Sequence, residues 1–279
     1  MYKSQDRYVN VGQIKTRYWM EGDGETPILL VHGLGGFIEN WHPCFSLLTD
    51  KHRVYAVDLL GHGRTDKPLS ASYTVADLAE FVKGFMTALN IDRANLVGHS
   101  LGGAVVLQFA LKFSDMVEKL TIVESAGLGK EGAFALRLLS LPLVGEMLSR
   151  PSRSGTAKML ETFVYDPTLV TDEEIDLHYQ MGTQPGGQQT FLKTLRAIAN
   201  LFGQKKMVYG SITSRLSSIN NPTLIIWGQQ DPVIPVAHAE IAAQKISDAQ
   251  VELIDNCGHN PMLEQTEVFT KLLLEFLKD

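Results

Sequence analysis

Cysteine, basic clusters and long apolar runs are scarce in this 279-residue chain. Its two cysteines, Cys44 and Cys257, stand far apart in the sequence, which gives neither a disulfide framework nor a zinc site. The net charge is −6 without a basic cluster, which argues against a nucleic-acid partner. No run reaches the ~18 apolar residues of a membrane span, and the first residues lack the apolar region of a targeting segment. We therefore expect a soluble, cytoplasmic protein that acts on a small molecule, without stable membrane insertion, metal or organic cofactor. The sequence leaves a homo-oligomer open.

Short apolar runs alternate with helical patterns along most of the chain. Apolar residues at helical spacing predict helices over 74–90, 101–113, 236–247 and 264–278. Continuous β-rich runs at 26–31, 53–59, 94–100, 119–125, 222–228 and 250–255 predict strands that are covered on both faces. This alternation indicates an α/β fold with a mostly parallel twisted sheet and helices on both faces. The first 22 residues predict an antiparallel hairpin on its edge.

One stretch interrupts this alternation. Residues 130–212 contain helix-like segments punctuated by prolines and no clear strand. We interpret them as a helical cap inserted into a core formed by residues 1–129 and 213–279. The segment 133–148 is rich in Leu, Phe and Met, so we expect an apolar pocket beneath it.

Residues Gly98 to Gly102 form a GxSxG motif centred on Ser100. The motif follows a predicted strand and opens a predicted helix, which is the strand–turn–helix setting that a nucleophilic serine requires. Glycines stand two positions on either side of the serine because a Cβ at such a sharp turn would clash. The pattern predicts that Ser100 is a nucleophile at the end of the sheet.

A serine nucleophile needs a base, and the base needs an acid to orient it. His259 follows the last predicted strand, and catalytic groups gather at the carboxyl ends of strands in such sheets. Asp231 has an equivalent place after the strand 222–228, and Glu124 is the second candidate for the acid. We expect the other histidines to be surface or structural residues, with His99 packed or hydrogen-bonded beside Ser100.

The developing oxyanion needs main-chain N–H donors, each contributing roughly 3–4 kcal/mol of transition-state stabilisation. Leu101 begins the helix after Ser100 and supplies one candidate donor. The loop His32–Gly36 supplies the other, for which we choose Leu34, with clearance provided by Gly35 or Gly36.

In its motifs the chain resembles the α/β-hydrolase family over essentially its full length. These motifs are HGLGG (32–36), DLLGHGRTDKP (58–68), GHSLGG (98–103), WGQQD (227–231) and CGHNPMLEQ (257–265). The resemblance implies the same nucleophile, base, acid and oxyanion donors. It is greatest to capped carboxylesterases and to hydrolases of aromatic ring-cleavage products, which break C–C bonds. The latter group typically has Asn where His99 stands and Trp where Asn260 stands.

We therefore expect a serine esterase for small to medium acyl chains. The C–C alternative needs a cation for the carboxylate of its vinylogous diketo acid substrate, and Arg196 is our candidate. His99, Asn260 and Gly35 complete the candidate pocket residues. A third possibility from another class is a hydrolase-like receptor or signalling protein that binds a small ligand.

Overall fold

The structure, a computed structural model, describes residues 4–278. Eight strands form one sheet in the order β1-β2-β4-β3-β5-β6-β9-β10. The strands from β4 to β10 run parallel, whereas β2 pairs antiparallel with both β1 and β4. The α/β fold with a mostly parallel sheet expected from the sequence is confirmed. The strands are β1 Arg7–Val11, β2 Ile14–Glu21, β3 Ile28–Val31, β4 Val54–Val57, β5 Ala94–His99, β6 Val117–Val123, β9 Thr223–Gly228 and β10 Ala249–Ile254.

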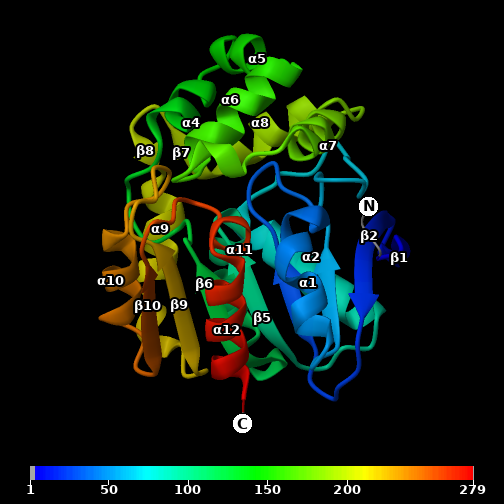
Figure 1. Ribbon diagram of the computed structural model, residues 1–279, viewed down its shortest axis with the longest axis vertical. Helices are drawn as coiled ribbons and strands as arrows, with labels where there is room; N and C mark the ends of the chain where they lie inside the picture. Colours follow the sequence, from blue (N-terminus) through cyan, green and yellow to red (C-terminus); the bar gives the residue numbers. More distant parts are fainter. Residues whose placement is uncertain (1–3, 279) are drawn as a thin grey trace.

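Helices cover both faces of the sheet, because alternate residues of the parallel strands point to opposite sides. In β3, Leu29 and Val31 belong to the core cluster under α2, α3 and α10, whereas Ile28 and Leu30 pack under α1 and α12. The two faces explain why these strands are continuously apolar. These helices are α1 His42–Thr49, α2 Val75–Ala88, α3 Leu101–Lys112, α10 Ala237–Ala243 and α12 Thr266–Leu277, with the short α11 Pro261–Glu264 before the last (Figure 1).

The predicted hairpin forms the β1 edge of the sheet, with Val11 paired to Ile14 across a two-residue turn. Gly12 adopts a φ of +60° in that turn, a conformation that glycine reaches without steric cost. The sequence did not predict α1, which follows the 3₁₀ helix η1 Ile38–Trp41.

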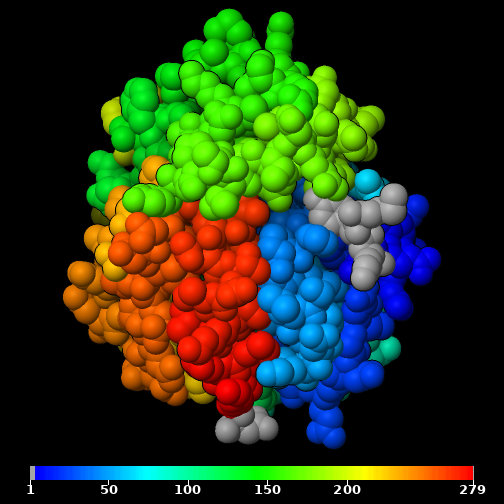
Figure 2. Space-filling view, in the orientation of Figure 1, coloured from blue at the N-terminus to red at the C-terminus, as the bar shows by residue number. Residues whose placement is uncertain are grey.

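Residues 130–212, called the cap segment below, lie above the carboxyl ends of the strands (Figure 1). Figure 2 shows the green part of this segment lying directly against both the red C-terminal part and the blue N-terminal part of the core. The segment also contains two strands of two residues each, which the sequence analysis missed because they are too short for a pattern. Its division from the core as a separate domain stays a prediction. Its elements are α4 Phe134–Leu139, α5 Val144–Leu148, α6 Arg153–Phe163, η3 Pro167–Leu169, α7 Asp172–Gly182, α8 Gly187–Ile198, β7 Ala199–Asn200 and β8 Gly203–Gln204; α9 Lys206–Thr213 and η4 Leu216–Ser218 lead back to β9.

Only part of the apolar segment 133–148 faces the protein interior. Leu136 and Leu139, three residues apart on α4, pack against the core. Phe134, Leu143, Met147 and Leu148 instead expose 54–82% of their surface. The two short helices therefore each turn one side to solvent, and an apolar pocket beneath the segment stays a prediction. Among residues 4–278, no helix combines the length and apolar character needed to cross a membrane.

Candidate active site

Ser100 stands on a strained turn between β5 and α3. Its φ of 55° and ψ of −116° lie where a non-glycine residue costs on the order of 1–3 kcal/mol. The flanking glycines permit this turn: a Cβ on Gly98 would lie 2.3 Å from the carbonyl oxygen of Gly102, and one on Gly102 would lie 2.1 Å from that of Val31. Contacts with main-chain atoms thus explain why glycine is required at both positions, as the sequence predicted.

The three residues predicted to act together lie in one hydrogen-bonded chain. The hydroxyl oxygen of Ser100 is 3.0 Å from Nε2 of His259. Nδ1 of the same imidazole is 2.8 Å from Oδ2 of Asp231. The other carboxylate oxygen of Asp231 accepts from the N–H groups of Val233 and Ile234 at 2.7 and 3.0 Å, which fixes the carboxylate after β9.

Glu124, the second candidate for the acid, lies next to the same imidazole. Its Oε2 is 3.5 Å from Nδ1 of His259, beyond hydrogen-bonding length, so Asp231 is the direct partner of His259. Burial, together with the nearby charge of Asp231, raises the pKa of Glu124 well above its usual range.

Hydrogen bonds with three other residues fix the loop that carries His259. Glu264, on α11, accepts from the N–H groups of Gly258 and Asn260 at 2.8 and 2.9 Å. The N–H of His259 donates to the carbonyl of Phe163 in the cap segment at 2.8 Å. Nε2 of His99 donates to the carbonyl of His259 at 2.7 Å, so the expectation of a hydrogen-bonding role for His99 is confirmed. These bonds fix the imidazole relative to Ser100.

The loop after β3 lies against the serine. A Cβ on Gly33 would lie 3.0 Å from Cβ of Ser100, tighter than most such contacts, so glycine favours this close approach. His32 fixes the loop, because its Nδ1 donates to the carbonyl of Gly33 at 2.8 Å and its Nε2 accepts from the N–H of Leu59 at 3.0 Å. Leu34 follows directly in this loop, and Leu101 follows Ser100 at the start of α3. Their role as oxyanion donors stays a prediction.

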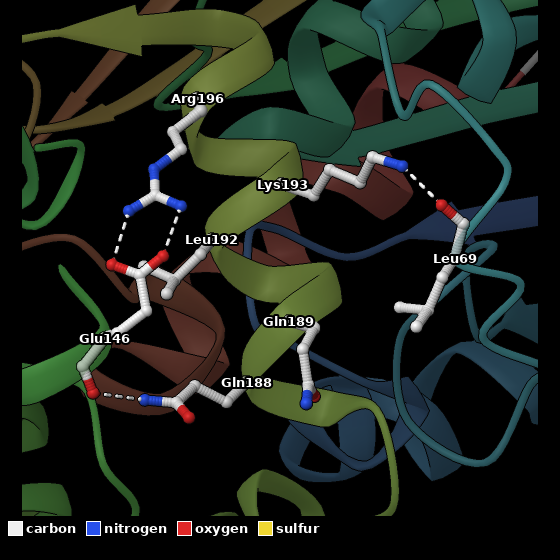
Figure 3. Close-up of a pocket in the computed structure, with 7 residues that line it drawn as sticks. All are labelled: Leu69, Glu146, Gln188, Gln189, Leu192, Lys193 and Arg196. Atoms are coloured by element: carbon white, nitrogen blue, oxygen red, sulfur yellow. Dashed lines mark hydrogen bonds and ion pairs between the residues drawn. The ribbon is translucent and has the colours of Figure 1, made fainter. Parts of the chain in front are cut away.

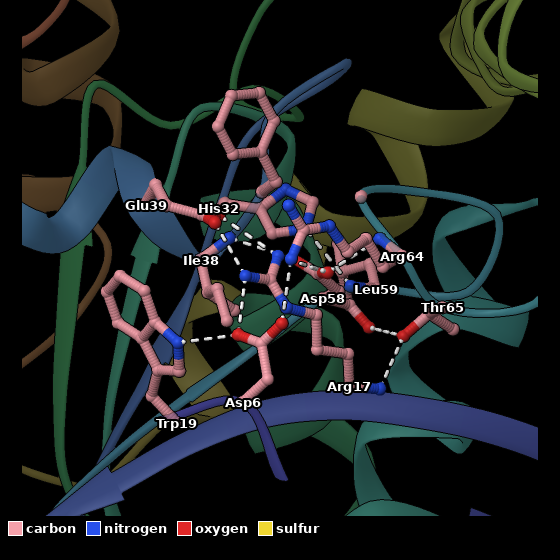
Figure 4. A network of polar contacts seen from close by, with 12 residues as sticks. Asp6, Arg17, Trp19, His32, Ile38, Glu39, Asp58, Leu59, Arg64 and Thr65 are labelled. Atoms are coloured by element: carbon pink, nitrogen blue, oxygen red, sulfur yellow. Dashed lines mark hydrogen bonds and ion pairs between the residues drawn. The ribbon is translucent and has the colours of Figure 1, made fainter. Parts of the chain in front are cut away.

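A buried network of charged side chains around Arg17 contacts the segment that follows this loop (Figure 4). The guanidinium of Arg17, on β2, donates to the carboxylates of Asp6 at 2.6 Å, Glu39 at 3.1 Å and Asp58 at 3.3 Å. Asp58 also accepts from the N–H of Ile38 at 2.8 Å. Burial raises the pKa of Asp58 although Arg17 and two N–H groups favour its charged form. Neither Arg17 nor Glu39 was expected from the sequence.

Arg196 lines a pocket on the cap segment, where its guanidinium is bonded to neighbouring groups (Figure 3). Its Nη1 and Nη2 donate to the two carboxylate oxygens of Glu146 at 2.7 and 2.8 Å. Its Nε and Nη2 also donate to the carbonyls of Ser140 and Leu141, at 3.1 Å each. All three nitrogens are therefore engaged within the cap segment, and a role for Arg196 as a cation for substrate stays a prediction that requires some of these bonds to break. The bonds form because helix α8 turns this side chain towards α5.

Gly35 and Asn260 both lie where the cap segment meets the core. A Cβ on Gly35 would be 3.2 Å from the ring of Phe191 on α8, and its φ of +69° also favours glycine. Asn260 lines a small cavity of about 30 Å³ between α6, α7 and the core. The other lining residues are Asn40, Pro43, Leu160, Val164, Val170, Glu174, His178, Met262 and Leu263.

Two of the histidines that were expected to be surface or structural residues are buried or nearly so. His238 pairs with Glu131 through Nε2 at 3.0 Å. Nε2 of His178 is 3.1 Å from Nδ2 of Asn40, and its Nδ1 has no hydrogen-bond partner. Burial lowers the pKa of His178 to about 4, so this imidazole is neutral at pH 7. Helical spacing alone did not show that α7 turns His178 towards the core.

His99, Glu124 and His259 bring possible metal-ligand atoms within 4.8 Å of one another. Both ring nitrogens of His259 already face partners, Ser100 and Asp231. A metal ion at this cluster would have to displace one of them, so we assign no metal.

A comparison with known families identifies the family to which a chain with this site belongs. The sequence model of the alpha/beta hydrolase fold matches residues 26–266. The chain belongs to the α/β-hydrolase family. This α/β hydrolase is 32% identical over 278 residues to the 2-hydroxy-6-oxo-2,4-heptadienoate hydrolase of Pseudomonas putida, covering 97% of this chain and 95% of the relative.

The solved structures of similar fold include proteins whose names indicate two different classes of substrate. A meta-cleavage product hydrolase from Pseudomonas fluorescens superposes with a TM-score of 0.84 at 29% identity, over 97% of this chain and 96% of that one. A bacterial membrane phospholipase A superposes with a TM-score of 0.83 at 26% identity, over 98% of this chain and 86% of that one. The α/β hydrolase is thus similar in fold to both.

Proposed function

We propose that this hydrolase cleaves carboxylic esters of small to medium acyl chains through an acyl-enzyme on Ser100. One observation carries the proposal: the hydrogen-bonded chain from the Ser100 hydroxyl through His259 to Asp231, on a turn that presents the hydroxyl at the end of the sheet. The similarity to a structure named as a phospholipase A, a name that denotes an ester hydrolase, supports the ester substrate.

The reaction follows from the order of these groups. The Ser100 oxygen attacks the ester carbonyl while its proton passes to Nε2 of His259, and Asp231 stabilises the imidazolium that forms. The N–H groups of Leu34 and Leu101 hold the oxyanion. His259 then gives the proton to the departing alcohol, which leaves the acyl group on Ser100. A water molecule, deprotonated by His259, releases the acid and restores the serine.

The relatives named as dienoate hydrolases support C–C bond hydrolysis as a second candidate. Their substrates, by name, carry a carboxylate, for which a binding site needs a cation or several N–H donors. Arg196 is occupied by Glu146. The cavity beside Asn260 is lined by neither lysine nor arginine, and its histidine, His178, is neutral at pH 7. This lining offers no cation to a carboxylate, which supports esters over dienoic acids.

Initial rates on p-nitrophenyl esters from acetyl to dodecanoyl test the proposal, with Ser100→Ala as the matched control. We expect steady turnover that peaks at one chain length and disappears in the variant. Ring-cleavage dienoates serve as the second substrate series. Turnover of the dienoates with negligible ester hydrolysis would replace the ester proposal by C–C hydrolysis. A single release of p-nitrophenol without turnover would instead favour the receptor class.

A further inference from the structure

Glu124 is a buried carboxyl that the mechanism above does not use. It follows β6 directly, next to β9, the strand that leads to Asp231. Its φ of 48° lies in the left-handed region, which a residue with a Cβ enters only at a cost of on the order of 1–2 kcal/mol. The N–H of Glu124 donates to the carbonyl of Ile226 at 3.0 Å, which holds the backbone in this conformation. The side chain is completely buried.

The two carboxyl oxygens of Glu124 have different surroundings. Oε1 accepts from the N–H of Gly228 at 2.9 Å. Oε2 has no hydrogen-bond partner, although burial makes such an unsatisfied oxygen costly. It lies 3.5 Å from Nδ1 of His259 and 3.5 Å from Nε2 of His99. A small rotation of the imidazole would turn the Nδ1 hydrogen from Asp231 towards this oxygen.

We propose that Glu124 is a second positioning carboxylate for His259, able to accept its Nδ1 hydrogen when Asp231 carries no charge. The inference rests on the proposed Ser100–His259–Asp231 relay and not on the ester as substrate. His259 would then have two acids on its Nδ1 side, of which Asp231 is the one that bonds it in this structure. No bond to the substrate is involved, since Glu124 acts only through the imidazole.

The charges around Glu124 explain why it is the second and not the first acid partner of His259. Two neighbouring carboxyl groups in a buried site cannot both ionise at low cost. Asp231 and Glu264 face it from the loop after β9 and from α11, and burial and both carboxylates raise its pKa. His99, His259 and the Cys257 thiol complete the titratable groups around it. Removing Asp231 removes the largest of these repulsions, so Glu124 ionises more readily and its charge replaces the lost one.

The test compares Asp231→Ala with the double variant Asp231→Ala/Glu124→Gln from about pH 6 to about pH 10. Two rates are measured in each: p-nitrophenyl ester turnover and phosphonylation of Ser100 by a fluorophosphonate probe, which needs no natural substrate. A relay without any acid loses about 10⁴-fold in rate. We expect Asp231→Ala to remain at least ~10-fold faster than the double variant at the alkaline end, with a rate that rises through an ionisation absent from the double variant.

Asp231→Ala/Asp255→Asn is the matched control, because Asp255 is an exposed nearby carboxylate that bonds Gln230 and not His259. This variant should keep the pH profile of Asp231→Ala. Equal rates and equal pH profiles for Asp231→Ala and the double variant would overturn the inference. Should Asp231→Ala fail to fold, Asp231→Asn retains an acceptor for Val233 and Ile234, and the same comparison applies. Wild-type phosphonylation without ester turnover would reject the ester proposal alone.

Discussion

The main-chain N–H of His259 donates to the carbonyl oxygen of Phe163 at 2.8 Å. A second bond runs beside it, from the N–H of Tyr165 to the carboxylate of Glu264 at 2.6 Å. The loop carrying the imidazole is therefore bonded to the cap segment in both directions. Any movement of the cap segment at Phe163 would pull on His259, so this part of the cap segment serves as a fixed support.

Gly258→Ala should push the loop that carries His259 away from residues 163–165 of the cap segment. The added Cβ would lie 2.7–2.9 Å from main-chain atoms of residues 163–165, which cannot yield as a flexible side chain can. We expect kcat to fall about 10- to 100-fold because the imidazole is displaced from Ser100. Ester turnover by Gly258→Ala and Gly132→Ala measures the effect. Gly132 is the control, since its nearest neighbour to an added Cβ is 4.0 Å away. Equal loss in both variants would contradict the explanation.

Arg17→Met should destabilise the fold strongly. The substitution keeps an apolar stem but leaves the buried carboxylates of Glu39 and Asp58 without their cation, at a cost of about 3–5 kcal/mol. Urea unfolding gives the change in the free energy of unfolding. Arg64→Met is the control: Arg64 binds Asp6 from an exposed position, so its loss should cost under ~1 kcal/mol. A small effect of Arg17→Met would mean that water replaces the guanidinium.

The parts of the site that the sequence predicted depend on local geometry. Ser100 is recognisable because the turn, its two glycines and the flanking strand and helix fall within a few residues. Asp231 and His259 are recognisable because each follows a strand, and parallel strands bring their carboxyl ends to one edge. The order of the strands in the sheet then places the two side chains together.

The parts that the sequence missed depend on contacts between distant segments. Arg17 meets Asp58 and Glu39 only because β2 pairs with β4 at the sheet's edge. Arg196 shows the same limit: the sequence predicts a substrate ligand on a cap helix and gives no sign of its partner 50 positions away. No spacing rule within one helix gives such a pairing.

Arg196→Ala should therefore leave substrate selectivity unchanged. Since its guanidinium binds Glu146 and two carbonyls of the cap segment, we expect a slightly lower melting temperature and ester kcat/KM within about 3-fold of wild type. Glu146→Ala should reproduce this small change. A loss of more than about 10-fold in kcat/KM for a dienoate, without loss for an ester, would show that Arg196 is a carboxylate ligand.

His178 should make the stability of this protein depend on pH in the acidic range. Its pKa is about 4 in the folded state against 6.5 in its ordinary state, because burial disfavours the charged ring. The folded protein thus binds fewer protons than the unfolded chain. The stabilisation is complete above about pH 6.5 and is lost as the pH falls towards 4. Each unit of pKa difference corresponds to about 1.4 kcal/mol.

The comparison of wild type with His178→Gln isolates this contribution, because the other buried histidines are common to both proteins. Glutamine can still pair with Asn40 but does not titrate. We expect the free energy of unfolding of the wild type to fall relative to the variant by about 3 kcal/mol between pH 7 and pH 4. Urea unfolding across this range measures the difference, and the NMR titration of the His178 ring locates its midpoint. Parallel stability curves with a ring midpoint near 6.5 would show that water reaches His178, and that the cavity beside Asn260 then holds a cation at mildly acidic pH.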